Sequence, residues 1–289
     1  MSSPLRRATE APPGQGLGLM RLGHPEADAG ADPVAVVHAA LDHGVTVLDT
    51  AEMYGNEDLV GRAVAGRRDE VVLCSKFGVR WGDSGRFDDW SVHADRASVV
   101  RSCDASLSRL GVDLIDVYYL HHRSDETPIE ETVTAMAQLV AAGKIREIGL
   151  SNVTVEDVRR AHAVHPVSAL QEQWSLAADA AEEFLPAVAD LDIVLVAHSP
   201  LGHGQLSGDT APAPLRAALA GPAARLGVTP AQVALAWVHH QSRPDRPVLP
   251  LPGTTSLGHL RTNIEAASIR LTDDELRALS VARLRTAPR

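Results

Sequence analysis

The chain has 289 residues, of which 45% are hydrophobic and 22% charged, so wholesale disorder is excluded and one large α/β barrel or two ordinary domains fit. The net charge of −10 argues against a surface that binds nucleic-acid phosphates. Two cysteines, Cys74 and Cys103, cannot build a disulfide framework and are expected to be reduced thiols. Since no segment has the length and apolar character of a signal peptide or membrane span, we expect a cytoplasmic protein without membrane or nucleic-acid partners.

Short apolar runs alternate with longer helical segments along the chain. The runs are mostly rich in Val, Ile and Leu and too short for helices, which is typical of strands buried on both faces. They lie at residues 16–20, 45–48, 70–75, 114–120, 147–150, 169–171, 193–197 and 247–251. Residues 1–15 precede the first run and are expected to be partly disordered.

Local signals mark helix boundaries between these runs. Asp32-Pro33 begins a helical stretch that ends at Gly44. Residues 127–130 (TPIE) combine an N-cap threonine, a first-turn proline and a capping-box glutamate, and residues 229–232 (TPAQ) and 272–275 (TDDE) repeat the pattern. Eight strands alternating with helices, without a linker, predict a single α/β domain, a (β/α)8 TIM barrel over residues 16–289.

Polar residues stand at or just after the ends of the predicted strands. In a (β/α)8 barrel the active site is built at the C-terminal strand ends, so these side chains are expected to converge. In chain order they are Asp49, Lys76, His121, Ser151, Asn152, Gln171 and His198, and Gly253 follows the eighth run.

Tyr54 follows Asp49 by five residues, on the loop that leaves the second predicted strand. A phenol with its ordinary pKa of ~10 is a weak acid at neutral pH, but the ammonium of Lys76 would lower that pKa. Asp49 would supply the counter-charge of the lysine, and His121 would orient a carbonyl oxygen. Such a set stabilises the oxyanion that develops when hydride reaches a carbonyl carbon, and the hydride itself requires a cofactor.

Each of these residues also has a purely structural explanation. A strand-end aspartate or lysine is often half of a structural ion pair, and Tyr54 alone would be a partly buried loop aromatic. His121 and His122 could form a metal pair, but adjacent strand residues face opposite sides and no HxH or HExxH spacing is present. The coincidence of polar residues on successive strand ends favours an active site without a metal.

Seven segments together resemble the aldo-keto reductases in the order in which they occur. The resemblance covers the chain from about Gly16 onward and is therefore more specific than any one motif. The segments are LDTAEMYG (48–55), CSKFG (74–78), YYLHH (118–122), GLSN (149–152), QEQWSL (171–176), HSPLGHG (198–204) and LPGTTSLGHLRTN (251–263).

This resemblance implies a (β/α)8 barrel that binds NADPH in preference to NAD, with a catalytic tetrad of Asp49, Tyr54, Lys76 and His121. It assigns the remaining strand-end residues to the cofactor. The nicotinamide end is implied to contact Ser151, Asn152, Gln171, His198, Ser199 and Leu201. The phosphate end is implied to contact Gly253, Thr254, Ser256, His259 and Asn263.

The sequence departs from the resembled pattern in places that concern binding. His198 stands where relatives commonly stack a tyrosine or tryptophan on the nicotinamide, and His259 stands where many carry arginine or lysine for the 2′-phosphate. Residues 14–19 lack the last glycine of a GxGxxG fingerprint, so the turn and helix start after residue 251 are the better anion site. Trp81, Trp90 and His122 are candidate substrate contacts beside a pocket without a long C-terminal loop.

The expected function is therefore reduction of an aldehyde or ketone, including a bulky or sugar-like carbonyl, to an alcohol. Two alternatives remain open on the sequence: a cofactor-binding sensor or channel-subunit-like protein with little turnover, and a metal-dependent barrel hydrolase. The substrate, the product stereochemistry and the oligomeric state are not indicated by any pattern.

Overall fold

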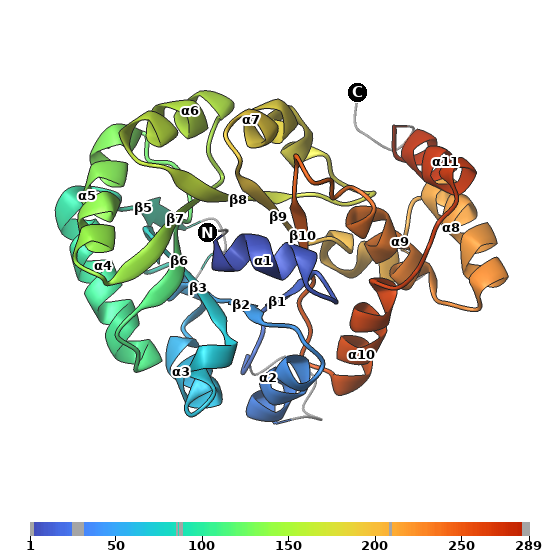
Figure 1. Cartoon of the computed structure of the whole chain (residues 1–289), viewed down its shortest axis with the longest axis horizontal. Helices are drawn as coiled ribbons and strands as arrows, with labels where there is room; N and C mark the ends of the chain where they lie inside the picture. The colour runs from blue at the N-terminus through green and yellow to red at the C-terminus, as the bar shows by residue number, and fades with distance from the viewer. Residues whose placement is uncertain (1–2, 25–31, 85, 87–88, 208–209, 285–289) are drawn as a thin grey trace.

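A computed structural model describes residues 3–24, 32–84, 86, 89–207 and 210–284. Eight of the strands in these ranges are parallel and form one sheet in the order β1-β2-β3-β6-β7-β8-β9-β10. Gly18 bridges to Gly253, and its N–H donates to the oxygen of Pro252 at 3.0 Å, so the first strand meets the last and the sheet closes into the expected barrel (Figure 1). The strands are β1 (Gly16–Gly18), β2 (Val47–Asp49), β3 (Val72–Phe77), β6 (Ile115–Leu120), β7 (Ile145–Ser151), β8 (Val167–Gln173), β9 (Val194–His198) and β10 (Val248–Leu251).

Helices surround this barrel, and each apolar run predicted as a strand overlaps one of the eight (Figure 1). Helix α8 packs on α9 and α11 packs on α8, which adds an outer layer on one side. The α-helices of this shell are α2 (Pro33–Asp42), α3 (Glu57–Val64), α4 (Arg96–Leu110), α5 (Ile129–Ala141), α6 (Val155–Val164), α7 (Leu185–Asp190), α8 (Ala213–Leu226), α9 (Pro230–His239), α10 (Leu257–Ala266) and α11 (Asp273–Leu284). Short 3-10 turns are η1 (Glu52–Tyr54), η2 (Arg68–Glu70), η3 (Ala180–Phe184) and η4 (Gly202–Ser207).

Two of the three predicted capping boxes are confirmed. Thr229 and Gln232 exchange backbone and side-chain hydrogen bonds at the start of α9, and Thr272 does the same with Glu275 before α11. The third prediction is wrong, because α5 begins after Pro128 and has no side-chain cap. Its glutamate, Glu130, instead accepts two hydrogen bonds of 2.7 Å from Arg160 of α6.

A short helix, α1 (Pro4–Glu10), covers the N-terminal end of the barrel, in the segment for which we expected partial disorder (Figure 1). Ser3 caps it by accepting the N–H of Arg6 at 3.2 Å, and Pro4 occupies the first turn, where its missing N–H costs nothing. Leu5 is fully buried in the lower barrel core beside Val47. Burial of this apolar side chain offsets part of the backbone entropy that the helix loses; residues 1 and 2 lie outside the described residues.

Glu147 of β7 is a buried carboxylate that makes the stability of the protein depend on pH. The residue is 8% exposed, and its Oε2 has no hydrogen-bond partner among the described residues. Burial raises its pKa to about 7, reinforced by Asp116 and opposed by Ser3, Arg146 and Arg7. Because the folded protein keeps a proton that the unfolded chain releases near pH 4.5, the free energy of unfolding falls as the pH rises from about 4.5 to 7.

Glu147→Gln should therefore stabilise the protein at pH 8 by up to about 3 kcal/mol while leaving stability at pH 4.5 nearly unchanged. Urea unfolding at the two pH values measures the difference. The matched control is Glu126→Gln, which neutralises an exposed carboxylate and should change neither value. An equal gain at both pH values would contradict the protonation argument.

Both cysteines are free and buried, as the sequence indicated. Within the described ranges, no helix combines the length and apolar character that crossing a bilayer requires.

Candidate active site

A buried ion pair lies at the C-terminal ends of β2 and β3. Lys76 is 1% exposed and Asp49 is 3% exposed, and their Nζ and Oδ1 atoms are in direct contact. The ammonium also donates to the oxygen of Thr50 at 2.9 Å, and the amide of Gln171 donates to the second oxygen of Asp49 at 2.9 Å. Each charge thus has an opposite charge and a further polar partner, which is what a charged pair needs in a dry interior.

Tyr54 ends η1 and places its phenol above this pair. Its hydroxyl lies 3.5 Å from the Nζ of Lys76, which is 5.0 Å from the centre of the phenol ring. The ring of His121, which directly follows β6, meets the ring of Tyr54 edge-on with 5.7 Å between centroids. The structure therefore brings together the four residues that the sequence predicted to converge.

Electrostatics at Tyr54 differ from the expectation in one respect. Burial raises the pKa of the phenol; Lys76 acts to lower it as predicted, Asp49 acts to raise it, and the net pKa is above the ordinary value of 10.0. The predicted net lowering of the Tyr54 pKa is wrong, because loss of hydration outweighs the single nearby cation. Tyr54 is therefore a protonated phenol at neutral pH.

Burial would by itself lower the pKa of Lys76, but attraction to Asp49 and Tyr54 outweighs it and the pKa is raised, so the side chain stays an ammonium. The histidines behave in the opposite way. Burial and the charge of Lys76 hold the pKa of His121 well below 6.5 and lower that of His198 to about 4. Both imidazoles are neutral at physiological pH and are available as hydrogen-bond donors.

Beside the ion pair, the end of β7 presents hydroxyl and amide groups. Asn152 has a φ of +52°, a backbone conformation that side chains other than glycine rarely adopt, and its Nδ2 donates to the oxygen of His121 at 2.9 Å and to Ser151 Oγ at 3.1 Å. Ser199, after β9, has a similar φ of +50°, and its hydroxyl lies 3.1 Å from the Nδ1 of His198. Strained residues of this kind concentrate at functional sites.

At the other predicted cofactor end, Ser256 caps α10 by accepting the N–H of His259 at 3.4 Å, and Thr254 Oγ1 accepts the N–H of Ser256 at 3.1 Å. His259 and Gly253 are exposed at this end, whereas Asn263 is 8% exposed on the buried side of α10. Leu201, which the resemblance implied as a nicotinamide contact, packs against the core below η4.

Comparison with known proteins agrees with this geometry. A profile of the aldo/keto reductase family matches residues 16–282. The chain belongs to the aldo/keto reductase family. It is similar to two Klebsiella pneumoniae aldo/keto reductase structures. One is in complex with NADP and acetate (34% identity, 94% of this chain and 91% of the other, TM-score 0.77), and one is in complex with NADPH (35%, 94% and 91%, 0.76).

A third similar structure is the glycerol dehydrogenase AKR11B4 from Gluconobacter oxydans, at 26% identity over 95% of this chain and 92% of the other, with a TM-score of 0.83. Each of these similarities covers more than 90% of this chain and more than 90% of the other chain. The protein therefore has the barrel of the aldo/keto reductases and is an oxidoreductase of this family.

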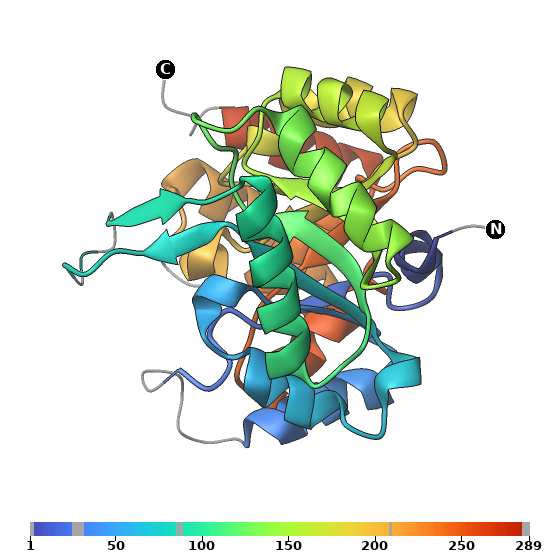
Figure 2. The same cartoon turned by 90° about the vertical axis from the view of Figure 1, so that its left-hand side faces the viewer.

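In this family member, the segment after β3 forms a hairpin of β4 (Val79–Trp81) and β5 (Trp90–Val92) (Figure 2). Trp81 and Trp90 are a directly opposed pair in it and remain 46% and 40% exposed. Trp90 lies 5.0 Å from the ring of His122, and Trp81 Nε1 donates to the oxygen of Met53 at 3.1 Å. The hairpin thus adjoins the turn that carries Tyr54, and all three candidate substrate residues lie at this end of the barrel.

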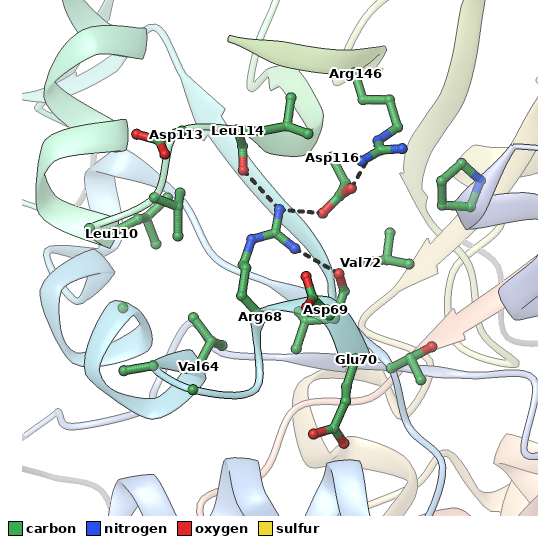
Figure 3. Close-up of a pocket in the computed structure, with 18 of the residues that line it drawn as sticks. Val64, Arg68, Asp69, Glu70, Val72, Leu110, Asp113, Leu114, Asp116 and Arg146 are labelled. Atoms are coloured by element: carbon green, nitrogen blue, oxygen red, sulfur yellow. Dashed lines mark hydrogen bonds and ion pairs between the residues drawn. The ribbon is translucent and has the colours of Figure 1, made fainter. Parts of the chain in front are cut away.

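A large groove of about 1040 Å³ contains none of these residues (Figure 3). It lies near α1 and the start of β6, and its central carboxylate, Asp116, accepts from Arg68 at 2.6 Å and pairs with Arg146 at 3.1 Å. Arg68 also donates to two backbone oxygens at 2.8 Å. Because these charges are already paired with one another, we assign this groove to packing between the helices and the strands rather than to the active site.

Several residues that build the site were not singled out from the sequence. Asn56 donates to the oxygens of Leu19 and Leu22 at 2.7 and 3.1 Å and accepts the hydroxyl of Thr50 at 2.6 Å, which ties the Tyr54 loop to the loop after β1. Glu57 is a buried carboxylate whose partners are far away in sequence. No local periodicity reveals such contacts; a charged residue at a helix position that faces the core is the only signal.

Within the described residues, no group of three or more His, Cys, Asp or Glu side chains is arranged to hold a metal ion. His121 and His122 have separate contacts, since the first faces Tyr54 and the second faces Trp90.

Proposed function

We propose that the protein reduces an aldehyde or ketone to an alcohol with NADPH, with Tyr54 as the proton donor. The observation that carries the proposal is the convergence of the Tyr54 hydroxyl, the neutral ring of His121 and the buried Lys76–Asp49 pair at the C-terminal end of the barrel. In a protein of this family, such a group is suited to protonate an oxygen on which charge develops.

The four side chains have different tasks in this proposal. Tyr54 holds the proton and transfers it to the carbonyl oxygen. Lys76 stabilises the phenolate that remains, because its ammonium lies 3.5 Å from the hydroxyl. Asp49 keeps Lys76 charged and fixes its position, and the neutral imidazole of His121 donates a hydrogen bond to the substrate oxygen.

The residues near the ion pair fit a nicotinamide cofactor. The hydroxyl of Ser151 and the amides of Asn152 and Gln171 offer donors and acceptors matched to a carboxamide, and His198 offers a flat neutral ring. When bound, the nicotinamide supplies the hydride that no side chain can supply. The two Klebsiella relatives with NADP and NADPH support the choice of the phosphorylated cofactor.

At the phosphate end, Ser256 and Thr254 open a helix whose first N–H groups suit an anion. His259 stands there in place of a permanent cation and should hold the 2′-phosphate less tightly than arginine does. We therefore propose contacts of the phosphates with Gly253, Thr254, Ser256, His259 and Asn263, with a smaller preference for NADPH over NADH than an arginine would give.

For the substrate, the exposed faces of Trp81 and Trp90 and the ring of His122 support a bulky or sugar-like carbonyl. Similarity to the Gluconobacter glycerol dehydrogenase supports a polyhydroxylated substrate. Oxidation of NADPH with a series of carbonyl compounds, from small aldehydes to aldoses and bulky ketones, tests both the reductase activity and the substrate class. Absence of turnover with every carbonyl would overturn the reductase proposal, whereas a strong preference for small aldehydes would overturn only the substrate class.

The pKa values also predict the pH profile. Because Tyr54 titrates above its ordinary value of 10.0 and His121 well below 6.5, neither group changes its charge between roughly pH 7 and 9. The kcat for carbonyl reduction at saturating NADPH should be flat across this range, while alcohol oxidation, which needs the phenolate, should accelerate as the pH rises. A reduction rate that titrates near pH 6.5 would contradict the neutral role of His121.

A further inference from the structure

Tyr54 is carried by a turn that has little support of its own. In η1 the N–H of Tyr54 donates to the oxygen of Ala51 at 3.1 Å, and the N–H of Gly55 donates to that of Glu52 at 3.2 Å. A single 3-10 turn is weakly held by such bonds. The position of the phenol must therefore depend on contacts that the turn makes with other elements.

One such contact is made by the first residue of α3. Glu57 is 1% exposed, and its Oε1 accepts the hydroxyl of Ser75 at 2.5 Å. Ser75 is the neighbour of Lys76 on β3, and adjacent strand residues face opposite sides. The Glu57–Ser75 bond thus links the chain just after Tyr54 to the strand that carries Lys76.

A second contact comes from the last turn of α4. Arg109 Nε and Nη2 approach Glu57 Oε2 at 2.7 and 2.6 Å, and its Nη2 lies 3.9 Å from Oε1 of Glu52, the first residue of η1. Helices α3 and α4 meet closely here, since a Cβ added at Gly61 would lie 2.3 Å from the oxygen of Leu110. Arg109 is therefore held where it contacts both sides of the Tyr54 turn.

Charge and burial make this arrangement sensitive to its partners. A carboxylate as buried as Glu57 requires a cation, and Arg109 supplies one while its own side chain remains 39% exposed. A second acidic atom, Oε2 of Glu52, is buried and has no hydrogen-bond partner in the described ranges, and Arg109 is a nearby positive charge that opposes it. Without Arg109, two carboxylates would remain on either side of Tyr54.

We propose that Glu57, Ser75 and Arg109 form a positioning clamp that sets the distance between the Tyr54 hydroxyl and Lys76. The inference rests on the proposed role of Tyr54. Glu57, Ser75 and Arg109 are positioning residues, since none of them lies among the groups described above as contacting Tyr54 or the Asp49–Lys76 pair. Its consequence is that the clamp controls kcat and leaves cofactor binding, which involves other strand ends, unaffected.

The test compares Arg109→Ala, Arg109→Lys and Ser75→Ala with wild type and with Arg225→Ala. The last variant removes an inter-helix arginine of the same chemistry, which donates two 2.7 Å bonds to Glu275 between α8 and α11, far from the site. Arg109→Ala should lower kcat by about 10- to 100-fold, because misplacement of a reacting group by ~1 Å has an effect of that size. The KM for NADPH should stay within about twofold, Arg109→Lys and Ser75→Ala should lose less kcat, and Arg225→Ala should match wild type.

Hydrogen exchange of residues 51–57 provides a second readout that needs no turnover. Exchange of this segment should be faster in Arg109→Ala and unchanged in Arg225→Ala. The clamp is overturned if Arg109→Ala keeps the kcat and the exchange of Arg225→Ala, or if kcat and cofactor KM deteriorate together. If the wild type reduces no carbonyl, the proposed function fails, and the exchange rates alone then decide whether the clamp holds the turn.

Discussion

Tyr54→Phe should lower kcat for carbonyl reduction by about 10³-fold while the Kd for NADPH, followed by fluorescence titration, stays within about twofold of wild type. The substitution removes only the hydroxyl that lies 3.5 Å from Lys76. The ring keeps its contact with His121, and the turn keeps its backbone bonds. Cofactor affinity should survive because the residues proposed to hold NADPH lie on other strands.

Tyr118→Phe is the matched control for this result. Within the part of the chain that the structure describes, its buried hydroxyl on β6 has no hydrogen-bond partner, so its removal deletes a phenol oxygen of no proposed use. Wild-type turnover is expected for this variant. Comparable rates in the Tyr54 and Tyr118 variants would remove Tyr54 from the proton-donor role and leave His121 as the group to test next.

Lys76→Met should destabilise the protein by about 3–5 kcal/mol and abolish turnover, because it leaves the Asp49 carboxylate buried with only the Gln171 amide as a close partner. Asp49→Asn should have an effect of similar size, since it strands a buried ammonium. The double variant removes both charges and should regain most of the lost stability while remaining inactive. Urea unfolding of the four proteins, together with NADPH turnover, measures both effects.

Arg225→Ala is the reference variant for the loss of stability that these buried charges cause. It breaks a half-exposed ion pair with Glu275 and should cost less than about 1 kcal/mol. A double variant no more stable than Lys76→Met would show that packing rather than the unpaired charge accounts for the loss. Retained turnover in the double variant would show that Tyr54 needs no cation beside it.

These expectations follow from the positions of the charged and the neutral side chains in the site. One end of the barrel holds the Asp49–Lys76 pair, the proposed clamp at Glu57 and Arg109, and the neutral rings of His121 and His198. The charged groups there are paired with one another, and the groups that we propose to face the substrate, Tyr54 and His121, are neutral. This separation places hydrogen-bond donors where negative charge would develop on a carbonyl oxygen.

The exposed tryptophans and the two unusual histidines bear on specificity. The Trp81–Trp90 hairpin is joined to the Tyr54 turn through Met53, so the proposed substrate contacts at the hairpin would lie on an element hydrogen-bonded to the turn that carries Tyr54. His198 and His259 offer less stacking area and less permanent charge than the residues that relatives commonly carry. Both differences concern affinity, and neither removes a group proposed for the chemistry.

The barrel, and the four residues that we propose for the chemistry, followed from the sequence alone. Strand positions were predictable because runs of Val, Ile and Leu buried on both faces leave a local signature. Asp49, Lys76, His121 and Gln171 were predictable as neighbours because parallel strands end at one face of a barrel. The family followed from ordered motifs.

Only the tertiary structure decided how these groups behave. The pKa of Tyr54 rises instead of falling because burial, which no motif records, outweighs the charge of Lys76. The order of α1 depends on the burial of Leu5 in a core formed by distant strands, and the Glu57–Arg109 pair joins residues 52 positions apart. Desolvation and long-range contacts are properties of the assembled fold, whereas sequence patterns report only the local contributions to the free energy of folding.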